Sequence, residues 1–378
     1  MLLHSITLTN LLSFNETTLD LRPLNVLIGA NASGKSNLIS AIGLLKAAPG
    51  NLLDAVNLGG GVRQWISQRQ PRRIVAAIQA EVELSTTDRL RYSLAFSEHD
   101  LGLHIVGESL RSVQDGIYFE RSPSRASIYK APGLPPGETD IQESRSLLAA
   151  YRDPTDPGPT TGLGEAFGAI QIFRSFNTSP ASQARRGASV GSPKDFLLDG
   201  GDNLALVLQN MHFRGTLDRL MEYLRRFWDG AEDIRINLEG GIAQTYVKER
   251  GIPNPMAALR LSDGTLKFLC LLAVLLHPEP PPLICIEEPE LGLHPDAVAV
   301  VADALREASE KCQVIVTTHS EALVGAFSDA PEAVVVCERG PDGGTEFRRL
   351  RSSDLDEWLE RYRLGELWRK GEIGGNRW

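Results

Sequence analysis

The sequence predicts an α/β protein with a mostly parallel core sheet, an additional antiparallel β patch and an inserted helical subdomain. Three observations support this fold class. A short apolar run at residues 24–28 ends at a glycine-rich turn that leads into a helical pattern. Apolar strands alternate with helices from about residue 265 onward, as in parallel sheets covered on both faces. Between these stretches, short runs of alternating apolar and polar residues indicate antiparallel strands.

The first lobe is expected over residues 1–135. Alternating residues at 3–9 and the apolar run at 24–28 predict strands, and apolar residues at near-helical spacing predict a helix over 35–47. The order is therefore strand, glycine loop, helix. The runs expected to form the antiparallel patch are 74–84, 90–96, 103–106 and 116–120.

A loop-rich helical insertion, or lid, is expected over residues 136–230. Its first part is rich in proline, glycine and serine, and helical periodicity covers 203–227. The last lobe, 231–378, opens with two strand patterns on either side of a Gly-Gly turn. Its further expected elements are helices at 265–276 and 295–311, strands at 283–286 and 314–317, a helix after residue 320, and strands near Val334 and Phe347.

Composition limits the kind of protein. The net charge of −9 does not suit a strongly basic nucleic-acid-binding protein, so a site for a polyanion must be local. The four cysteines form no C-x-x-C pair, which favours a reducing, cytoplasmic location. The longest apolar run, 268–276, is far shorter than the roughly 20 residues of a membrane helix, and no secretion signal opens the chain. We expect a soluble protein without a membrane partner. The seven histidines lack metal-ligand spacing, which argues against a metalloenzyme.

The strongest motif is the glycine loop at residues 29–36, Gly-Ala-Asn-Ala-Ser-Gly-Lys-Ser, which fits G-x-x-x-x-G-K-[ST]. It follows a buried strand and opens a helix, where backbone N–H groups can surround phosphate oxygens. Lys35 can reach the β- and γ-phosphates, and the Ser36 hydroxyl can ligate Mg²⁺. This context disfavours an ordinary glycine turn and predicts a site for ATP and Mg²⁺. The other candidate contacts in and beside the loop are Gly29, Asn31, Ser33, Gly34 and Asn37.

A second motif is a pair of carboxylates, Glu287 and Glu288, at the end of an apolar strand. Because successive strand residues point to opposite sides, one carboxylate can serve Mg²⁺ through its water shell while the other faces the attacking water. A solvated acidic turn is the alternative when the pattern is taken alone. The glycine loop favours a nucleotide site, because such sites form at the carboxyl ends of parallel strands.

Two further patterns are weak in isolation. Ser262 and Gly264 stand at the start of an apolar helix, where a hydroxyl and backbone N–H groups can bind an anion. A capping residue before a core helix explains this pattern equally well. His319 follows an apolar strand, where a lone histidine is usually only a satisfied polar group.

Taken together, the motifs resemble those of ABC-type ATPase heads of the RecF/SMC/OLD-like class, and within it the stand-alone bacterial ATPases without long coiled coils. The resemblance covers about residues 1–100 and 230–378, and no motif of the insertion matches. The matching segments are 8–14 (first strand), 29–37 (Walker A), 262–265 (signature), 287–295 (Walker B and D-loop), 318–320 (switch histidine) and the tail 365–368.

The resemblance implies an Mg²⁺-dependent ATPase that forms a homodimer around two ATP molecules. Each ATP would be held by Lys35 and Ser36 of one subunit and capped by Ser262 and Gly264 of the other. The signature departs from the common pattern at Asp263, where glycine is frequent, and nothing in the sequence explains a negative side chain there.

The resemblance also implies roles for the strand-end residues. Glu288 would be the general base, Glu287 would bind Mg²⁺ together with Ser36, and His319 would sense the γ-phosphate. Transporter ABC domains usually carry Asp where Glu287 stands, but the longer carboxylate still reaches hydrated Mg²⁺. No clear Q-loop is present: Gln64 and Gln171 are the only candidates.

Two biological roles are open. The first is an ATP-gated switch on double-stranded DNA in genome maintenance or phage defence, supported by arginine pairs at 72–73, 185–186 and 225–226, although such pairs more often form ion pairs. The second is a nucleotide-sensing ATPase that controls a separate toxin or nuclease without tight DNA binding. It is supported because no cluster of nuclease-like acidic residues follows His319. A transporter subunit is disfavoured by the doubled glutamate, the opening strand and the insertion.

Overall fold

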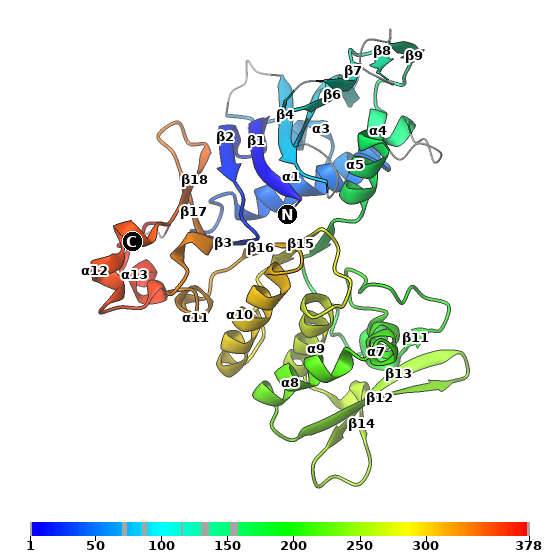
Figure 1. Ribbon diagram of the computed structural model, residues 1–378, viewed down its shortest axis with the longest axis vertical. Helices are drawn as coiled ribbons and strands as arrows, with labels where there is room; N and C mark the ends of the chain where they lie inside the picture. Colours follow the sequence, from blue (N-terminus) through cyan, green and yellow to red (C-terminus); the bar gives the residue numbers. More distant parts are fainter. Residues whose placement is uncertain are drawn as a thin grey trace. The chain divides into compact units, whose positions relative to one another are not determined.

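The chain folds into two compact units (Figure 1). The computed structural model describes residues 2–69, 74–84, 89–114, 116–129, 136–151 and 158–375. Unit 1 consists of residues 1–170, 335–350 and 373–378, and unit 2 of residues 171–334 and 351–372. Each of these units contains residues from more than one of the three regions expected from the sequence. The division of the chain into domains at 1–135, 136–230 and 231–378 stays a prediction.

An antiparallel sheet dominates unit 1, with the strand order β2-β1-β4-β5-β6-β7-β8-β9. Ile6 and Leu8 of β1 face Ala80 and Ile78 of β4, and all four side chains are buried. The antiparallel patch predicted over 74–120 is therefore confirmed. The strands are β1 (Leu3–Leu11), β2 (Phe14–Asp20), β4 (Val75–Val82), β5 (Leu90–His99), β6 (Gly102–Ser112), β7 (Ile117–Arg121), β8 (Arg125–Ile128) and β9 (Gly137–Asp140).

Unit 1 also contains the glycine loop, between β3 (Leu24–Ile28) and α1 (Lys35–Ala47). Both elements have the predicted bounds. Every residue of β3 is buried, as expected for a strand covered on both faces. β17 (Val334–Arg339) lies next to β3 and pairs antiparallel with β18 (Thr345–Arg349). The other helices of this unit are α2 (Leu52–Leu58), α3 (Val62–Trp65), α4 (Leu147–Ala150) and α5 (Pro159–Gly168).

Unit 2 contains parallel strands in the order β10-β15-β16. β15 (Leu283–Glu287) and β16 (Gln313–Thr317) match the sequence prediction closely, and their apolar residues are buried. β10 (Gln171–Phe173) was not predicted, because it lies in the segment expected to be a helical insertion and is too short to show a period. α9 (Asp263–Leu275) is buried on nearly all sides, and α10 (Pro295–Ser309) packs against it.

The predicted helical stretch at 203–227 is two helices rather than one. α7 (Leu204–Phe213) and α8 (Leu217–Phe227) are separated at Gly215, whose φ of 70° is left-handed and ends the first helix. The predicted hairpin is confirmed as β12 (Ala231–Glu239) and β13 (Ile242–Glu249). The remaining elements are α6 (Gln183–Arg186), β11 (Ala188–Ser189), β14 (Met256–Ala257), η1 (Ala258–Arg260), α11 (Glu321–Gly325), η2 (Pro331–Ala333), η3 (Ser352–Asp354), α12 (Asp356–Leu359) and α13 (Leu364–Lys370).

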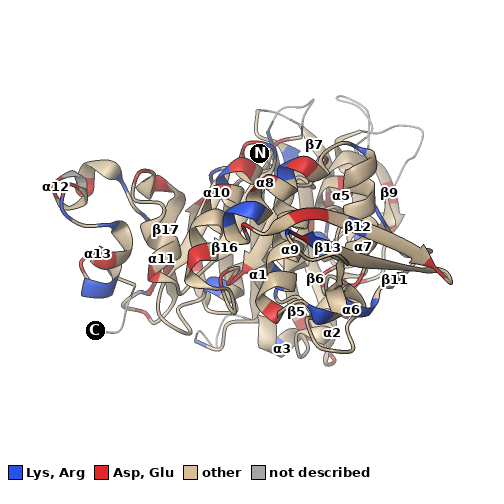
Figure 2. Ribbon diagram, turned by 90° about the horizontal axis from the view of Figure 1, so that it is seen from below, with Lys and Arg blue, Asp and Glu red and all other residues tan. Residues whose placement is uncertain are grey.

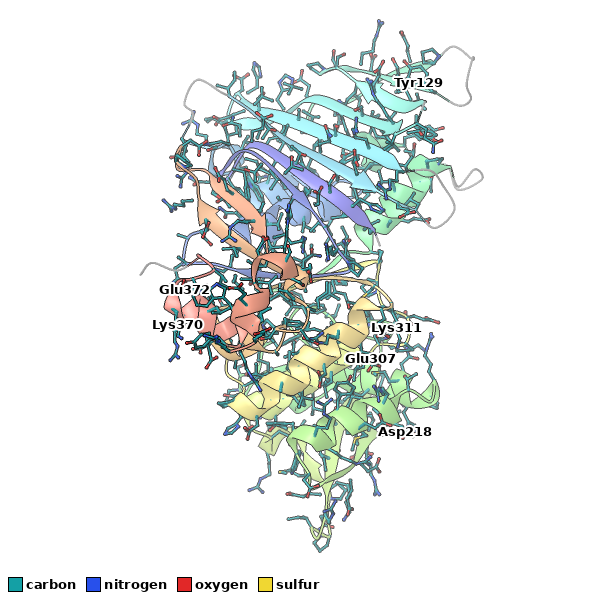
Figure 3. All side chains as sticks on the ribbon, turned by 60° about the vertical axis from the view of Figure 1, so that its left-hand side comes forward. Tyr129, Asp218, Glu307, Lys311, Lys370 and Glu372 are labelled. Atoms are coloured by element: carbon teal, nitrogen blue, oxygen red, sulfur yellow. The ribbon has the colours of Figure 1, made fainter. Side chains whose placement is uncertain are left out.

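Polar contacts join α8 to α10 within unit 2. Figure 3 labels Asp218 of α8 and Glu307 of α10. Arg219 forms an ion pair with Glu307, and the Tyr223 hydroxyl donates to the same carboxylate at 2.8 Å. Burial, assisted by this hydrogen bond, raises the pKa of Tyr223 to about 12. Arg226 pairs with Asp303 of α10. Figure 2 shows the result, with basic and acidic segments close together along α8 and α10 rather than separated into faces.

A buried carboxylate in unit 1 sits in a polar network of its own. Glu108 of β6 accepts hydrogen bonds from the Tyr92 hydroxyl (2.9 Å), the Ser146 hydroxyl (2.7 Å) and the Leu147 N–H (2.7 Å). Burial raises the pKa of Glu108, and the hydrogen bonds only partly oppose this effect. The network fixes the start of α4 to the sheet.

The raised pKa of Glu108 predicts a pH-dependent stability. Above the ordinary glutamate pKa of 4.5 and up to the raised native value, the native state binds this proton more tightly than the unfolded chain. The free energy of unfolding should therefore fall as pH rises through this window, by at most about 1.4 kcal/mol per pH unit. Glu108→Gln should remove this slope in urea-unfolding midpoints measured at several pH values. The exposed Glu16→Gln should retain it, and an equal slope in both variants would contradict the assignment.

Candidate functional site

The glycine loop of unit 1 has backbone conformations that few residue types tolerate. Gly29 and Gly34 have φ values of 152° and 111°, and Ala32 between them has φ of 62°. A Cβ atom at Gly29 would clash with the carbonyl oxygen of Cys337, and one at Gly34 would clash with the Thr345 hydroxyl. The β17–β18 hairpin thus presses directly on the loop, so both glycines are required for steric as well as conformational reasons.

Side chains of the same hairpin hold the loop in its curled shape. The Thr345 hydroxyl donates to the Ser33 carbonyl oxygen at 2.7 Å, and the Arg339 guanidinium donates to the Ala32 carbonyl oxygen at 3.2 Å. Sequence reasoning missed both residues, because they lie about 300 positions after the loop and belong to no motif. Both contacts engage carbonyl oxygens of the loop and not its N–H groups, which are the groups that bind anions in loops of this kind.

Lys35 folds back over the loop. Its Nζ donates to the carbonyl oxygens of Gly29 (2.7 Å) and Ala30 (3.0 Å), and the side chain is buried. Asn37, in the first turn of α1, donates to the Ser13 hydroxyl at 2.8 Å. The predicted Walker A residues therefore form one cluster at the start of α1.

A hollow of about 510 Å³ opens beside this cluster. Asn31 and Ser33 of the loop line it together with Glu338 and Arg339 of β17. Its size lies within the roughly 300–1,000 Å³ of small-ligand pockets. The loop therefore borders a hollow of the size that small ligands occupy.

In unit 2, β15 and β16 end side by side, with Glu287 opposite Thr317 in the register. The N–H of Glu288 donates to the Thr317 carbonyl oxygen at 2.9 Å, and Glu288 has a left-handed φ of 46°. Such a conformation is strained for a residue with a long side chain, and strain of this kind concentrates at functional sites. The Glu288 carboxylate lies 3.8 Å from Nε2 of His319. The structure thus brings together the carboxylate and the histidine singled out in the sequence.

Glu290 supports the segment that carries His319. One of its carboxylate oxygens accepts from the Thr318 hydroxyl (2.5 Å) and from the His319 N–H (3.2 Å). The other oxygen is buried and has no hydrogen-bond partner among the described residues. This edge of the sheet is therefore rich in carboxylate oxygens, which are the ligands that Mg²⁺ and its water shell prefer.

The signature tip is the start of α9. The Ser262 hydroxyl caps the helix by accepting from the Thr265 N–H at 3.1 Å. A Cβ atom at Gly264 would lie 3.0 Å from the carbonyl oxygen of Gly292, so the D-loop backbone packs directly on the tip. Lys267, one turn further along, donates to the D-loop carbonyl oxygen of Leu291. Signature and D-loop are thus in contact within unit 2.

Arg174 is a site residue that the sequence did not reveal. It follows β10 directly, and its guanidinium lies 3.1 Å from the carboxylate of Glu287. Of the two Q-loop candidates, Gln171 is the first residue of β10 and Gln64 lies exposed in α3. The signal that could have found Arg174 is the same as for Glu287 and His319: a polar residue at the exit of an apolar strand.

The fold brings together histidines that are scattered in the sequence. Ligand atoms of His99, His104 and Glu143 lie within 4.8 Å of one another. His99 ends β5, His104 lies in β6, and Glu143 lies in the segment after β9. Nδ1 of His104 is 3.7 Å from the Glu143 carboxylate, a histidine–carboxylate contact. The absence of ligand spacing therefore did not exclude a histidine cluster, although none of these residues belongs to the nucleotide motifs.

The fold and the motifs define an ABC-type P-loop ATPase head of the RecF/SMC/OLD-like class. Residues 24–150 and 179–325 match the profile of the family described as "AAA domain, putative AbiEii toxin, Type IV TA system". Since the match covers well over half of the chain, the chain belongs to this family, and nucleotide binding is the property that the family implies.

Among the proteins similar to the chain are one curated relative and two solved structures. The Old nuclease of Escherichia phage P2 is 23% identical over 94% of this chain, which spans 62% of that protein's length. An SMC head bound to the C-winged helix domain of ScpA shares the fold, with a TM-score of 0.56 at 15% identity over 93% of this chain and 99% of that one. An SMC head with an extended coiled coil, bound to the C-terminal domain of ScpA derived from Pyrococcus furiosus, has a TM-score of 0.54 at 15% identity over 95% and 98%.

Throughout the described ranges, each helix is too short or too polar to cross a lipid bilayer.

Proposed function

We propose that the protein is an Mg²⁺-dependent ATP hydrolase that works as an ATP-sandwiched homodimer. The observation that carries the proposal is the glycine loop, whose left-handed turns are enforced by β17 and β18 and whose Lys35 lies over the loop. A cytoplasmic location fits the four cysteines, which are buried thiols.

Lys35 would exchange its carbonyl contacts at Gly29 and Ala30 for the β- and γ-phosphates of ATP. The Ser36 hydroxyl and the Glu287 carboxylate would hold Mg²⁺, and both are oxygen donors of the kind this ion prefers. When bound, Mg²⁺ neutralises charge on the phosphate oxygens.

Glu288 would take the proton of the attacking water. It directly follows β15, and the alternation of side chains along a strand would direct its carboxylate away from that of Glu287. His319, 3.8 Å away, would donate to the γ-phosphate and keep the water in line. Glu290 would fix the backbone of His319 through the hydrogen bond at 3.2 Å.

The second half of each site would come from a second copy of the chain. Ser262 and the N–H groups at the start of α9 would cap the γ-phosphate, because the first N–H groups of a helix have no partner within it. Leu291 of the D-loop and Leu259 are 64% and 49% exposed, and Ser262 borders a hollow of about 290 Å³. Apolar side chains exposed beside such a tip suit a surface that pairs with another copy.

The test is the mass of the protein in solution with and without ATP and Mg²⁺. We expect the mass to double with ATP, and Ser262→Arg to weaken this dimer by at least about tenfold by placing a bulky side chain on the tip. The exposed Ser353→Arg should behave as the parent. A parent protein that stays monomeric with ATP at high concentration would contradict the homodimer.

The biological role that we propose is an ATP-gated switch on DNA in genome maintenance or phage defence. The alternative, control of a separate toxin or nuclease, is favoured by one observation: Arg225 and Arg226 contact this chain's own carbonyl and carboxylate groups. The pair at 72–73 lies outside the described residues. Adding double-stranded DNA to the same mass measurement separates the roles, since a DNA complex at low salt that is lost at high salt supports the first and no complex supports the second.

A further inference from the structure

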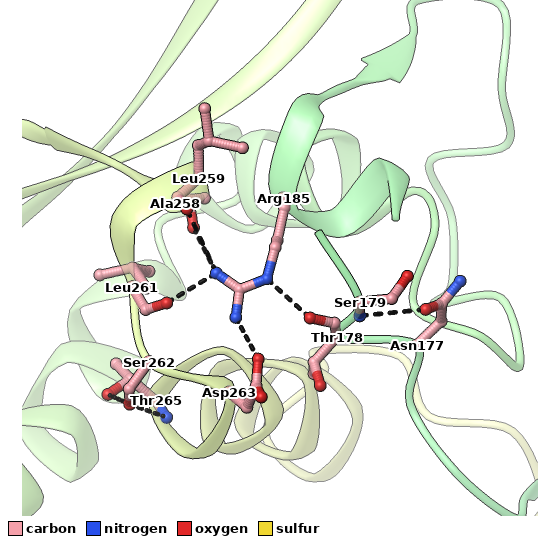
Figure 4. A network of polar contacts seen from close by, with 10 residues as sticks. All are labelled: Asn177, Thr178, Ser179, Arg185, Ala258, Leu259, Leu261, Ser262, Asp263 and Thr265. Atoms are coloured by element: carbon pink, nitrogen blue, oxygen red, sulfur yellow. Dashed lines mark hydrogen bonds and ion pairs between the residues drawn. The ribbon is translucent and has the colours of Figure 1, made fainter. Parts of the chain in front are cut away.

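Arg185 of α6 is buried at the foot of the signature helix (Figure 4). Its side chain is only 7% exposed and forms an ion pair with the carboxylate of Asp263, the first residue of α9. On its other side, Nε donates to the Thr178 carbonyl oxygen at 2.7 Å. The guanidinium therefore joins the segment before α6 to the start of α9.

The same guanidinium also fixes the backbone that leads into the signature. Nη1 donates to the carbonyl oxygen of Leu261 at 2.6 Å, and the carbonyl oxygens of Ala258 and Leu259 lie at 3.3 and 3.4 Å. A planar fork of donors suits such a set of acceptors, which a single ammonium group cannot serve at once. Ser262 follows directly, so its position depends on Arg185.

The ion pair accounts for the unexplained negative charge in the signature. Asp263 is 75% exposed and stands on the first turn of α9, where a carboxylate stabilises the helix. The same charge would repel a phosphate that approaches the tip. With Arg185 beneath it, Asp263 can stabilise the helix while the net charge of the pair is zero.

We propose that Arg185 is a positioning residue for the signature tip: it neutralises Asp263 and holds residues 258–261, so that Ser262 and the start of α9 can receive the γ-phosphate of ATP bound by a second copy. This inference rests on the proposed homodimer. It also assigns the arginine pair 185–186 to the chain's own architecture, since Arg186 donates to the Pro180 carbonyl oxygen.

The experiment compares four proteins that all carry Glu288→Gln, which is expected to stabilise the ATP dimer: the parent, Arg185→Met, Arg185→Met with Asp263→Asn, and Arg186→Met as the matched control. For each, the dimer dissociation constant is measured by sedimentation with ATP and Mg²⁺, and ATP affinity is measured with a fluorescent ATP analogue under monomeric conditions. Arg185→Met should weaken the dimer by about tenfold or more at low salt, with ATP affinity unchanged. Asp263→Asn should restore part of this loss, and Arg186→Met should match the parent.

The outcomes separate the two proposals. A parent that fails to dimerise with ATP overturns the proposed homodimer and this inference with it. A parent that dimerises while Arg185→Met dimerises equally well overturns only the inference. If Arg185→Met loses dimerisation and Asp263→Asn does not restore it, the proposed neutralisation of Asp263 by Arg185 is overturned. The loss would then come from the missing support of the backbone at residues 258–261. If thermal melting shows that Arg185→Met does not fold, Arg185→Lys carries the test: it keeps the charge but not the fork, and parent-like dimerisation would contradict the role of the fork.

Discussion

Glu288→Gln should lower the rate of ATP hydrolysis by about 10²- to 10⁴-fold, the usual contribution of a general base, and leave ATP bound. Glutamine has the same shape but cannot accept the proton of the attacking water. The backbone at this position, with φ of 46° and its N–H bonded to the Thr317 carbonyl oxygen, does not depend on the side-chain charge. Phosphate release measures the loss, and the mass in solution should show a dimer that persists with ATP.

A matched control is Glu310→Gln, at the exposed end of α10. It should hydrolyse ATP at the parent rate. If Glu288→Gln also kept the parent rate, Glu288 would not be the base, and Glu287 would be the next residue to test.

Lys35→Ala should weaken ATP binding by about 100-fold or more, because its ammonium is the side-chain cation that the glycine loop places for the β- and γ-phosphates. The side chain is buried over the loop, so the change removes a charge and its two carbonyl contacts without adding bulk. Titration with a fluorescent ATP analogue measures the affinity, and thermal melting checks the fold.

The control for this change is Lys46→Ala in the last turn of the same helix. It should bind the analogue as the parent does. Near-parent affinity in Lys35→Ala would mean that the loop does not hold a triphosphate, and the proposed function would fail at its first step.

The parts of the fold predicted best are those specified by local sequence. β3 and α1 have the predicted bounds because an apolar run, a glycine turn and a helical period follow one another without interruption. The break at Gly215 was missed because the periodicity on both sides of it is helical. β10 was missed because its neighbour in the sheet, β15, lies more than 100 residues away in the sequence.

The candidate site divides in the same way. Lys35, Glu288 and His319 stand at the ends of apolar strands or beside glycines, so they can be recognised from the sequence alone. Their roles stay predictions. Arg185 acts on residues far along the chain, and a lone arginine in a polar segment has no pattern. Arg174 does follow an apolar strand, but that strand, β10, is too short to be recognised in the sequence. The close approach of Gly264 to the carbonyl oxygen of Gly292 was also invisible, because it arises from packing between segments separated in the sequence.

That packing has a consequence for how two catalytic centres would communicate. The tip of α9 rests on the D-loop, and Lys267 joins the two by donating to the carbonyl oxygen of Leu291, three residues after Glu288. In the proposed dimer, a shift of Glu288 on hydrolysis would therefore be transmitted through a few rigid contacts to the opposite ATP. Hydrolysis of one ATP would then change how tightly the other is bound. The two sites would therefore hydrolyse ATP and release its products cooperatively rather than independently.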